Sequence, residues 1–206
     1  PILVGGTGLY FKALTDGLSS IPKIPLKIRN QIRALHQKIG QKRFYQQLLK
    51  IDPISVNKIK PNDSHRSLRA YEIKFYTQKS IHNYFKNTKS NFKEIDFYKI
   101  YIDFPRQDLI EKIKLRTEQM INSGAVNEVK NFIKLKVKKD KSVNKAIGIN
   151  EIRQYLKNEK DLHEISEQIS IKTRQYAKRQ STWARGNMKT WLRLKPKQLN
   201  KFLNKI

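Results

Sequence analysis

The chain has 206 residues, enough for one sizeable hydrophobic core or for one core with a small appended domain. Its 44 Lys and Arg outnumber 17 Asp and Glu, and the formal charge of +27 at pH 7 favours a negatively charged partner, with nucleic acid first and an anionic membrane second. The lack of cysteine excludes disulfides and thiolate metal sites and fits a reducing cytosol, and no window is apolar enough for a transmembrane helix.

The first residues are typical of a short buried strand followed by a glycine turn. Pro1–Val4 is apolar, Gly5-Gly6-Thr7-Gly8 ends the run, and a helical pattern follows from Leu9 to about Leu14. Strand, glycine turn and helix is the order in which backbone N–H groups at a helix N-terminus receive a phosphate. The turn lacks the Gly-Lys-Ser/Thr ending of the P-loop pattern, so a purely structural turn is the alternative.

Residues 19–95 form a mostly polar block that we expect to be a helical insertion outside the sheet. Short amphipathic helices are predicted over 26–39, 42–51 and 53–59. Asn62 or Asp63 is expected to cap a further helix from Ser64 to about Thr77, and residues 86–92 form a polar loop. On the 64–77 helix Arg66 and Arg69 share one side, where ordinary surface charges are the alternative to a binding role.

A second strand is predicted over 97–104, and a helix over 107–123 that ends at Gly124. Arg116 lies about 20° from the apolar stripe of that helix, so we expect it to be half-buried. A snorkelling side chain is the alternative reading of such a cation.

The C-terminal half is predicted to be largely helical. A short helix over 126–135 leads into a lysine-rich segment, Lys134–Lys145, expected to be a flexible loop. The remaining predictions are a small-residue turn at 146–148, helices over 150–156 and 161–185, a strand over 190–194 and a closing helix over 196–206.

The helix over 161–185 is basic and carries aromatic residues among its cations. At about 100° per residue, one stripe of this helix is cationic and consists of Arg174, Lys178, Ser181 and Arg185. The opposite stripe is expected to pack on a core and consists of Ile165, Ile169, Tyr176, Gln180 and Trp183. A solvated cationic face and a nucleic-acid surface are both compatible with the first stripe, and the net charge of the chain favours the second.

Several segments together resemble the tRNA dimethylallyltransferase family, also called the tRNA isopentenyltransferase family. The resemblance rests on segments spread over nearly the whole chain: Val4–Leu14; Ile59–Asp63 with Arg66, Arg69 and Ala70–Ile73; Arg116 with Met120, Gly124, Glu128 and Val129; Ala146–Gly148 with Glu151; and Thr173–Arg185. Each segment is weak evidence alone, but their order and spacing match those of the family.

The resemblance implies a P-loop NTPase-like α/β core, partial and predominantly helical in this chain, with core parts at 1–18 and 96–206 and the helical insertion at 19–95. It also implies transfer of a dimethylallyl group from dimethylallyl diphosphate to the exocyclic N6 amine of the adenosine 3′-adjacent to the tRNA anticodon. The base is expected to be flipped out to reach the donor. The expected partners are the tRNA anticodon stem-loop and dimethylallyl diphosphate, with Mg²⁺, for a cytoplasmic monomer that binds no membrane.

The resemblance also implies roles for individual residues. Thr7 and Arg116 correspond to catalytic residues, and Gly6, Thr7 and Arg116 to diphosphate-binding residues. The expected tRNA contacts fall in four groups: Arg29; His65, Arg66, Ser67, Leu68 and Arg69; Lys145, Ala146, Ile147, Gly148, Ile149 and Asn150; and Arg174, Lys178, Arg179, Gln180, Ser181, Thr182, Trp183, Ala184 and Arg185.

The chain departs from the family pattern in ways that limit these expectations. It begins at Pro1 with no signal peptide, and the family's P-loop and catalytic aspartate have no counterpart in it, so we expect a piece of a longer protein that transfers no prenyl group by itself. The Mg²⁺ ligands are expected on the substrate or in that other part. Lys112 stands where many members have arginine, which keeps the charge but loses the bidentate fork.

Two other functions stay open. A non-catalytic basic RNA-binding module explains the charge but not the Gly-Gly-Thr-Gly turn. A P-loop kinase-like phosphotransferase explains the turn but not the charge. A membrane-surface role is disfavoured because the cations are spread along the chain and are not gathered on one amphipathic helix.

Overall fold

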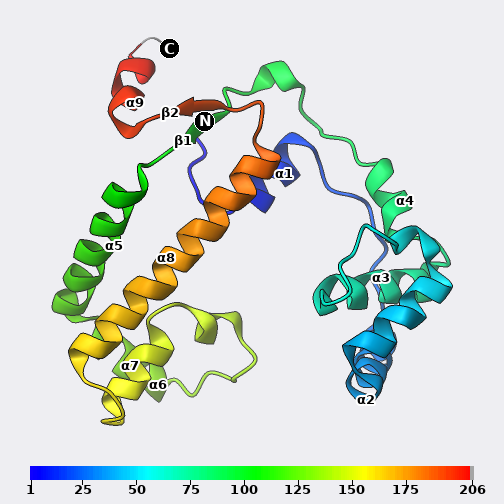
Figure 1. The fold of residues 1–206 in the computed structure, drawn as a ribbon, viewed down its shortest axis with the longest axis horizontal. Helices are drawn as coiled ribbons and strands as arrows, with labels where there is room; N and C mark the ends of the chain where they lie inside the picture. Colours follow the sequence, from blue (N-terminus) through cyan, green and yellow to red (C-terminus); the bar gives the residue numbers. More distant parts are fainter. Residues whose placement is uncertain (205–206) are drawn as a thin grey trace. The chain divides into compact units, whose positions relative to one another are not determined.

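Helices make up most of the structure. The computed structural model describes residues 1–204, and within them the sheet content is one pair of short parallel strands (Figure 1). The predominantly helical chain with a small parallel sheet agrees with the predicted fold class. By its internal contacts the chain divides into unit 1, which is Pro1–Gly8 with the chain from Tyr98 onward, and unit 2, which is Leu9–Phe97.

Unit 2 is a small helical unit. Its elements are the helix α1 (Gly8–Thr15, whose first residue lies in unit 1), α2 (Leu26–Ile51), α3 (Ser64–Thr77) and α4 (Ile81–Lys86), with 3₁₀ turns at Pro53–Ser55 and Glu94–Asp96. The predicted insertion, 19–95, lies within this unit, which also takes in 9–18. The predicted helix over 53–59 is only a 3₁₀ turn, and the short helix α4 was not predicted.

Local signals set the helix boundaries of unit 2. Gly40 has φ 73° and interrupts α2 at the predicted division between two helices. The Asp63 carboxylate accepts a hydrogen bond from the Arg66 N–H at 3.0 Å and caps α3, which decides between the two predicted capping residues.

The core of unit 2 lies between α2, α3 and α4. Its buried side chains are Ile24, Leu48, Ile59, Ala70, Ile73 and Ile81. Burial of such a set supplies most of the favourable free energy of a small helical unit. The apolar positions of α2 and α3 therefore fix which face of each helix is left for solvent and for partners.

Unit 1 carries the strands and the longest helices. Its elements are β1 (Ile100–Ile102), α5 (Arg106–Met120), a π turn (Ile121–Ala125), α6 (Val126–Lys134), a 3₁₀ turn (Ser142–Lys145), α7 (Ile149–Leu156), α8 (Leu162–Asn187), β2 (Leu192–Leu194) and α9 (Pro196–Leu203). Strands β1 and β2 pair in parallel, with Ile100 opposite Leu192. The closing helix was predicted to reach residue 206, and its last two residues lie outside the described part.

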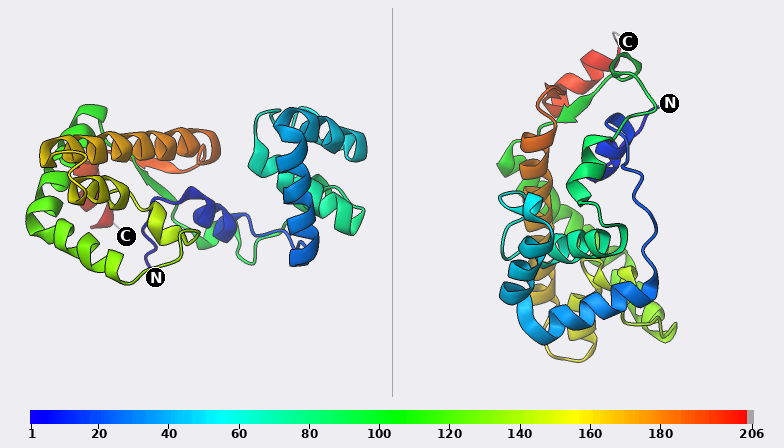
Figure 2. Two further views of the ribbon diagram at one scale, coloured as in Figure 1. Left: turned by 90° about the horizontal axis from the view of Figure 1, so that it is seen from below. Right: turned by 90° about the vertical axis from the view of Figure 1, so that its right-hand side faces the viewer.

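Helices α6 and α7 pack against α8 through a second core (Figure 2). Its buried residues are Ala125, Val129, Ile152, Ile165 and Ile169. Asp161 and Glu164 form a reciprocal capping box at the start of α8, with 2.7 Å from the Glu164 N–H to the Asp161 carboxylate. This core fixes the first half of α8 in unit 1.

Three predictions for unit 1 are corrected by the structure. Pro1–Val4 is extended but exposed and forms no strand, because a strand needs a hydrogen-bonded neighbour and the described residues offer it none. The predicted strand over 97–104 is only three residues long. Gly124, with φ 100°, does not end the chain's helical run but bends it from α5 into α6.

Within residues 1–204, every helix is too short or too polar to cross a bilayer.

Candidate functional site

The cationic stripe of α8 lines a groove in unit 1. The groove has a volume of about 550 Å³, and all four predicted stripe residues, Arg174, Lys178, Ser181 and Arg185, face it. Helix α5 lies beside α8 and forms the other wall (Figure 1). The predicted stripe is therefore one continuous surface of the folded unit.

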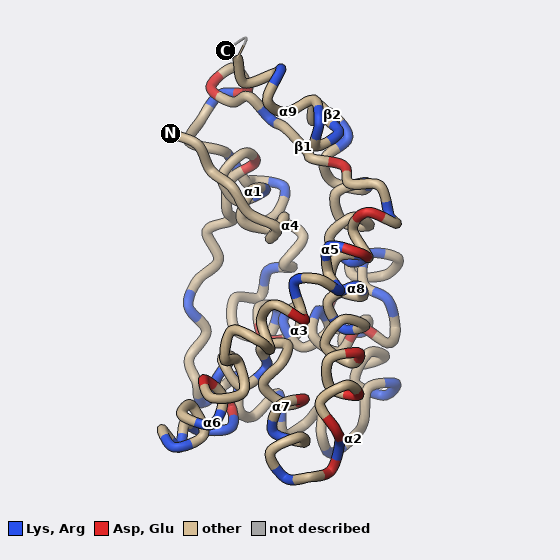
Figure 3. The backbone as a smooth tube through the Cα atoms, turned by 90° about the vertical axis from the view of Figure 1, so that its left-hand side faces the viewer, with Lys and Arg blue, Asp and Glu red and all other residues tan. Residues whose placement is uncertain are grey.

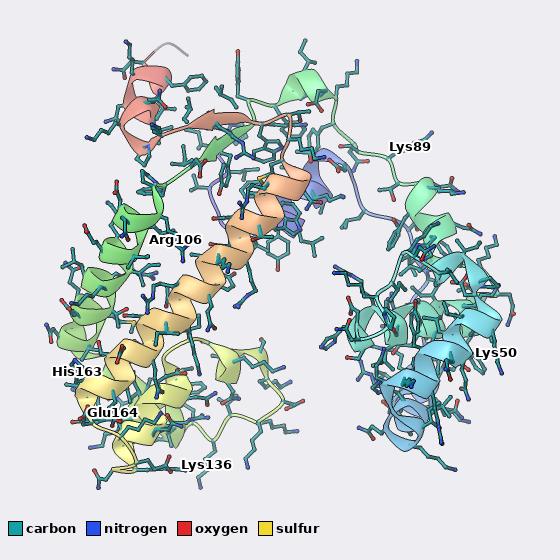
Figure 4. The ribbon with its side chains drawn as sticks, in the orientation of Figure 1. Lys50, Lys89, Arg106, Lys136, His163 and Glu164 are labelled. Carbon is teal, nitrogen blue, oxygen red and sulfur yellow. The ribbon has the colours of Figure 1, made fainter. Side chains whose placement is uncertain are left out.

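The groove has an apolar floor and a cationic rim. Leu109, Ile110 and Ile113 of α5 line it together with Tyr101 and Phe104 beside β1. The rim carries Arg106, which begins α5 (Figure 4), as well as the α8 cations and Arg193 of β2.

Positive charge dominates this groove. Among the described residues that line it, Asp103 is the one carboxylate, and it is paired with Arg193 at 3.8 Å. Among residues 1–204 the other cations of the groove, Arg106, Arg174, Lys178 and Arg185, have no ion pair. Figure 3 shows Lys and Arg in blue along α8. A groove with several unneutralised cations attracts anions and loses part of its self-repulsion when one binds.

The glycine turn of the N-terminal segment packs directly on α8. The Gln180 side-chain amide donates a hydrogen bond to the Gly6 carbonyl at 2.9 Å. A Cβ added at Gly8 would lie 2.1 Å from the Trp183 ring, so only glycine fits there. Two motifs more than 160 residues apart in sequence thus meet, and Thr7 lies exposed between the two glycines.

The opposite stripe of α8 is buried only in part. Ile165 and Ile169 are buried in the core, and Gln180 and Trp183 are half-buried beside the glycine turn. Tyr176 was expected to be buried but is 44% exposed, with Arg179 packed over its ring at 5.6 Å. The core formed with α6 and α7 reaches only the first half of α8. Tyr176 lies in the second half, so its side chain stays exposed.

Arg116 does not have its predicted burial. It lies on α5 but is exposed, and its side chain makes no hydrogen bond or ion pair with any residue of the described chain. Its neighbours on the helix, Ile113 and Thr117, are buried. The apolar face of α5 is narrower than the sequence pattern indicated, and Arg116 falls outside it and does not line the groove.

Arg29 and Arg69 meet in unit 2 at a buried carboxylate. Glu72 is 3% exposed and lies 3.5–3.8 Å from the guanidinium groups of Arg29, Arg33 and Arg69. The Arg29 Nε is itself buried and has no hydrogen-bond partner among the described residues.

A pocket of about 330 Å³ opens beside this arginine cluster. Arg29, Arg69 and Lys23 line it where α2 begins. One carboxylate among these cations leaves a net positive pocket. No binding role was predicted for Arg33 or Glu72, although their spacing of four residues from Arg29 and three from Arg69 places each pair on one helix face.

The other predicted residues of α3 are divided between surface and interior. His65 and Arg66 are exposed, and Arg66 is paired with Asp63 at 3.1 Å. Leu68 is half-buried. Ser67 is fully buried, and its hydroxyl donates to the Asp63 carbonyl, so it cannot offer its side chain to a partner.

The turn before α7 is held to α8 by a buried carboxylate for which no role was predicted. Glu151 is 2% exposed, accepts a hydrogen bond from the Gly148 N–H at 2.9 Å, and is paired with Lys172 of α8. Burial opposes ionisation of this carboxyl, but the hydrogen bonds from Lys172 and from backbone N–H groups outweigh it and hold its pKa below the ordinary value. The carboxylate therefore stays charged near neutral pH.

This turn leaves some predicted residues exposed and buries others. Lys145, Ala146, Ile147 and Asn150 are exposed, and Ile149 is half-buried. Gly148 is buried, as is Ala184 of α8. Of the other predicted α8 residues, Arg179 and Thr182 are exposed.

A Ser–His–Asp set in unit 2 is structural. Asp52 is 1% exposed and accepts hydrogen bonds from the Ser55 and Ser80 hydroxyls at 3.0 and 2.9 Å. His82 lies 3.3 Å from the Ser55 hydroxyl, and burial followed by the charge of Lys58 lowers its pKa. Ser55 is fully buried and donates to Asp52, so it cannot act as a nucleophile. Within residues 1–204 no group of three or more His, Asp or Glu side chains is placed to hold a metal ion.

Known proteins resemble the chain over nearly its whole length. The sequence pattern of the family described as IPP transferase matches residues 1–187. A tRNA dimethylallyltransferase of Pelagibacter ubique is 56% identical over 206 residues, which are all of this chain and 66% of that protein. A tRNA dimethylallyltransferase of Rickettsia massiliae is 39% identical over 184 residues, 89% of this chain and 51% of that protein.

Solved structures of related transferases also resemble this chain. A eukaryotic dimethylallyltransferase described as acting on tRNA matches with a TM-score of 0.71 and 27% identity, over 89% of this chain and 47% of that one. A full-length tRNA isopentenylpyrophosphate transferase of Bacillus halodurans matches with a TM-score of 0.54 and 28% identity, over 92% of this chain and 57% of that one. The chain spans between about half and two thirds of the length of these curated relatives. On the family match over residues 1–187, the chain belongs to the IPP transferase family.

Proposed function

We propose that this chain provides the tRNA-binding surface and part of the catalytic site of a cytoplasmic, monomeric tRNA dimethylallyltransferase. The reaction moves a dimethylallyl group from dimethylallyl diphosphate to the N6 amine of the adenosine 3′-adjacent to the anticodon. The supporting observation is the packing of the Gly6–Gly8 turn on α8 through Gln180 and Trp183. This packing puts Thr7 on the same unit as the cationic groove, as a joint diphosphate and tRNA site requires.

In this proposal each cluster has its own chemical task. The Thr7 hydroxyl hydrogen-bonds where charge develops on the departing diphosphate. Arg116, which is exposed and has no ion pair within residues 1–204, supplies a guanidinium to the same group. The α8 groove and the arginine cluster around Glu72 bind backbone phosphates, which fix the position of the tRNA but do not read its sequence. The expected Mg²⁺ finds no suitable set of carboxylates or histidines among residues 1–204, so no step is assigned to it.

A transfer assay tests the proposal. The chain would replace the aligned part of the Pelagibacter ubique relative, and label would be followed from dimethylallyl diphosphate into bulk tRNA. The chimera should transfer label, and Thr7→Ala should lower the rate by about 100-fold, as removal of one such donor does elsewhere, while Thr7→Ser retains most of it. The chain alone should bind tRNA without transferring label.

The two alternative functions give different results in the same assay. A chimera that transfers nothing but binds tRNA in a salt-sensitive way indicates a non-catalytic RNA-binding module. Weak tRNA binding at physiological salt together with small-molecule phosphorylation indicates a kinase-like phosphotransferase. Either result, obtained with an active relative as the positive control, refutes the proposal.

A further inference from the structure

The segment between α6 and α7 is a second cationic surface, separate from the α8 groove. We call residues Lys134–Lys145 the lysine loop. It carries Lys134, Lys136, Lys138, Lys139, Lys141 and Lys145 against a single acidic residue, Asp140. All of these lysines are exposed, and among residues 1–204 none has an ion pair or a side-chain hydrogen bond. Lys136 is labelled where the loop leaves α6 (Figure 4).

The lysine loop, which the sequence predicts to be flexible, is hydrogen-bonded to unit 1. The buried Asn144 side chain donates to the Lys138 carbonyl at 2.9 Å and accepts from Arg153 of α7 at 3.0 Å. Arg153 also lies over the Phe132 ring of α6 at 5.8 Å. The backbone that carries the lysines is therefore tied to both neighbouring helices, so less conformational entropy is lost when a partner binds.

Fixed and unneutralised cations at this density repel one another unless an anion lies against them. The loop runs directly into the turn Lys145–Asn150, one of the predicted tRNA contacts. Between α6 and the 3₁₀ turn at Ser142 the backbone is not helical, so it does not offer the amphipathic helix with which proteins lie on a lipid surface. Charge, exposure and position favour a nucleic-acid backbone over a membrane.

We propose that the lysine loop is an RNA-backbone binding surface. It neutralises tRNA phosphates other than those held by the α8 groove and supplies a large part of the salt-dependent affinity. The inference rests on the proposed function, because it takes tRNA as the partner. It assigns a role to Lys134–Lys141, to which none is given above, and extends the expected tRNA contact at Lys145.

The experiment compares two variants with equal loss of charge. The loop variant carries Lys→Gln at Lys136, Lys138, Lys139 and Lys141. The control variant carries Lys→Gln at the exposed Lys189, Lys195, Lys197 and Lys201, which lie around β2 and α9. Binding of the 206-residue chain to an unmodified tRNA transcript is measured by fluorescence anisotropy from 50 to 300 mM NaCl, and circular dichroism checks that each variant folds. Binding to vesicles of phosphatidylglycerol and phosphatidylcholine is measured in parallel.

The loop variant should bind the transcript about tenfold or more weakly at 0.1 M salt, and its log–log salt slope should be smaller by about 3, or roughly 0.7–0.9 per lost phosphate contact. The control variant should change much less. Equal effects in both variants would show only a net-charge effect and overturn the proposal. So would unchanged tRNA binding by the loop variant, or a loss confined to vesicles. If the parent chain binds no tRNA, the proposed function itself is contradicted. If the parent chain binds tRNA and the loop variant binds it equally well, only the role of the lysine loop is contradicted.

Discussion

The contact between Glu151 and Lys172 gives the most direct test of how unit 1 is held together. The Glu151 carboxylate, 2% exposed, accepts from the Gly148 N–H and from the Lys172 ammonium, and so connects the turn before α7 to α8. The perturbations are Glu151→Gln, which keeps an acceptor oxygen without the charge, and Glu151→Leu, which removes the acceptor as well.

The expected magnitudes follow from these partners. Hydrogen bonds to charged groups contribute about 1.5–3 kcal/mol and neutral ones about 0.5–1.5 kcal/mol, so Glu151→Gln should cost about 1–2 kcal/mol. Glu151→Leu also leaves the buried Gly148 N–H without an acceptor, and its total cost should be about 3 kcal/mol. The Lys172 side chain is 51% exposed, so water solvates its ammonium when the carboxylate is removed. Loss of the ion pair with Lys172 therefore adds little to the loss of unfolding free energy.

Urea unfolding followed by tryptophan fluorescence measures these costs. Both tryptophans, Trp183 and Trp191, lie in unit 1, so the signal reports on that unit and not on unit 2. The double variant Glu151→Gln with Lys172→Gln should cost less than the sum of the single variants, because the two residues act as a pair. Additive single effects, or a cost below about 0.5 kcal/mol for Glu151→Leu, which is the range of ordinary surface substitutions, would refute the reasoning.

The same contact predicts a pH dependence. The pKa of Glu151 in the folded chain lies below its ordinary value of 4.5, so folding favours the ionised form. The resulting stabilisation is fully present above that ordinary value and is lost as the pH falls through the lower folded pKa. The urea midpoint of the parent chain should therefore fall on acidification below pH 4.5, and that of Glu151→Gln should fall less.

Two further predictions concern the glycine turn and the arginine cluster. Gly8→Ala should displace the turn from α8 and destabilise unit 1 by about 1–3 kcal/mol, because the new Cβ meets the rigid Trp183 ring. Gly6→Ala should cost less, because its new Cβ meets only the flexible end of the Gln180 side chain. If Gly8→Ala and Gly6→Ala changed the tryptophan emission and the urea midpoint by the same amounts, this reasoning would be contradicted. Glu72→Gln should destabilise the packing of α2 on α3 by about 1–3 kcal/mol, because three guanidinium groups lose their shared carboxylate but stay partly solvated. Hydrogen exchange of the α2 and α3 amides measures this loss, with the single-pair variant Arg33→Gln as the milder control, and unchanged protection in Glu72→Gln would rule it out.

Features that depend on near neighbours in the chain could be predicted from the sequence. The break at Gly40 and the cationic stripe of α8 were predicted, and the cap of α3 was narrowed to Asn62 or Asp63, because helical hydrogen bonds and helix faces repeat within a few residues. The expected groups of site residues came from the family resemblance, which also depends on local motifs.

Which of these motifs meet, and which side chains stay accessible, depends on how the chain packs in three dimensions. Pro1–Val4 has the composition of a strand, but strand formation depends on a pairing partner far away in sequence. The packing of Gly8 on Trp183, the gathering of arginines at Glu72 and the exposure of Arg116 each depend on contacts between distant segments or on how far a core extends. The periodicity of residues within one helix does not predict contacts with distant segments, so these contacts could be identified only in the folded chain.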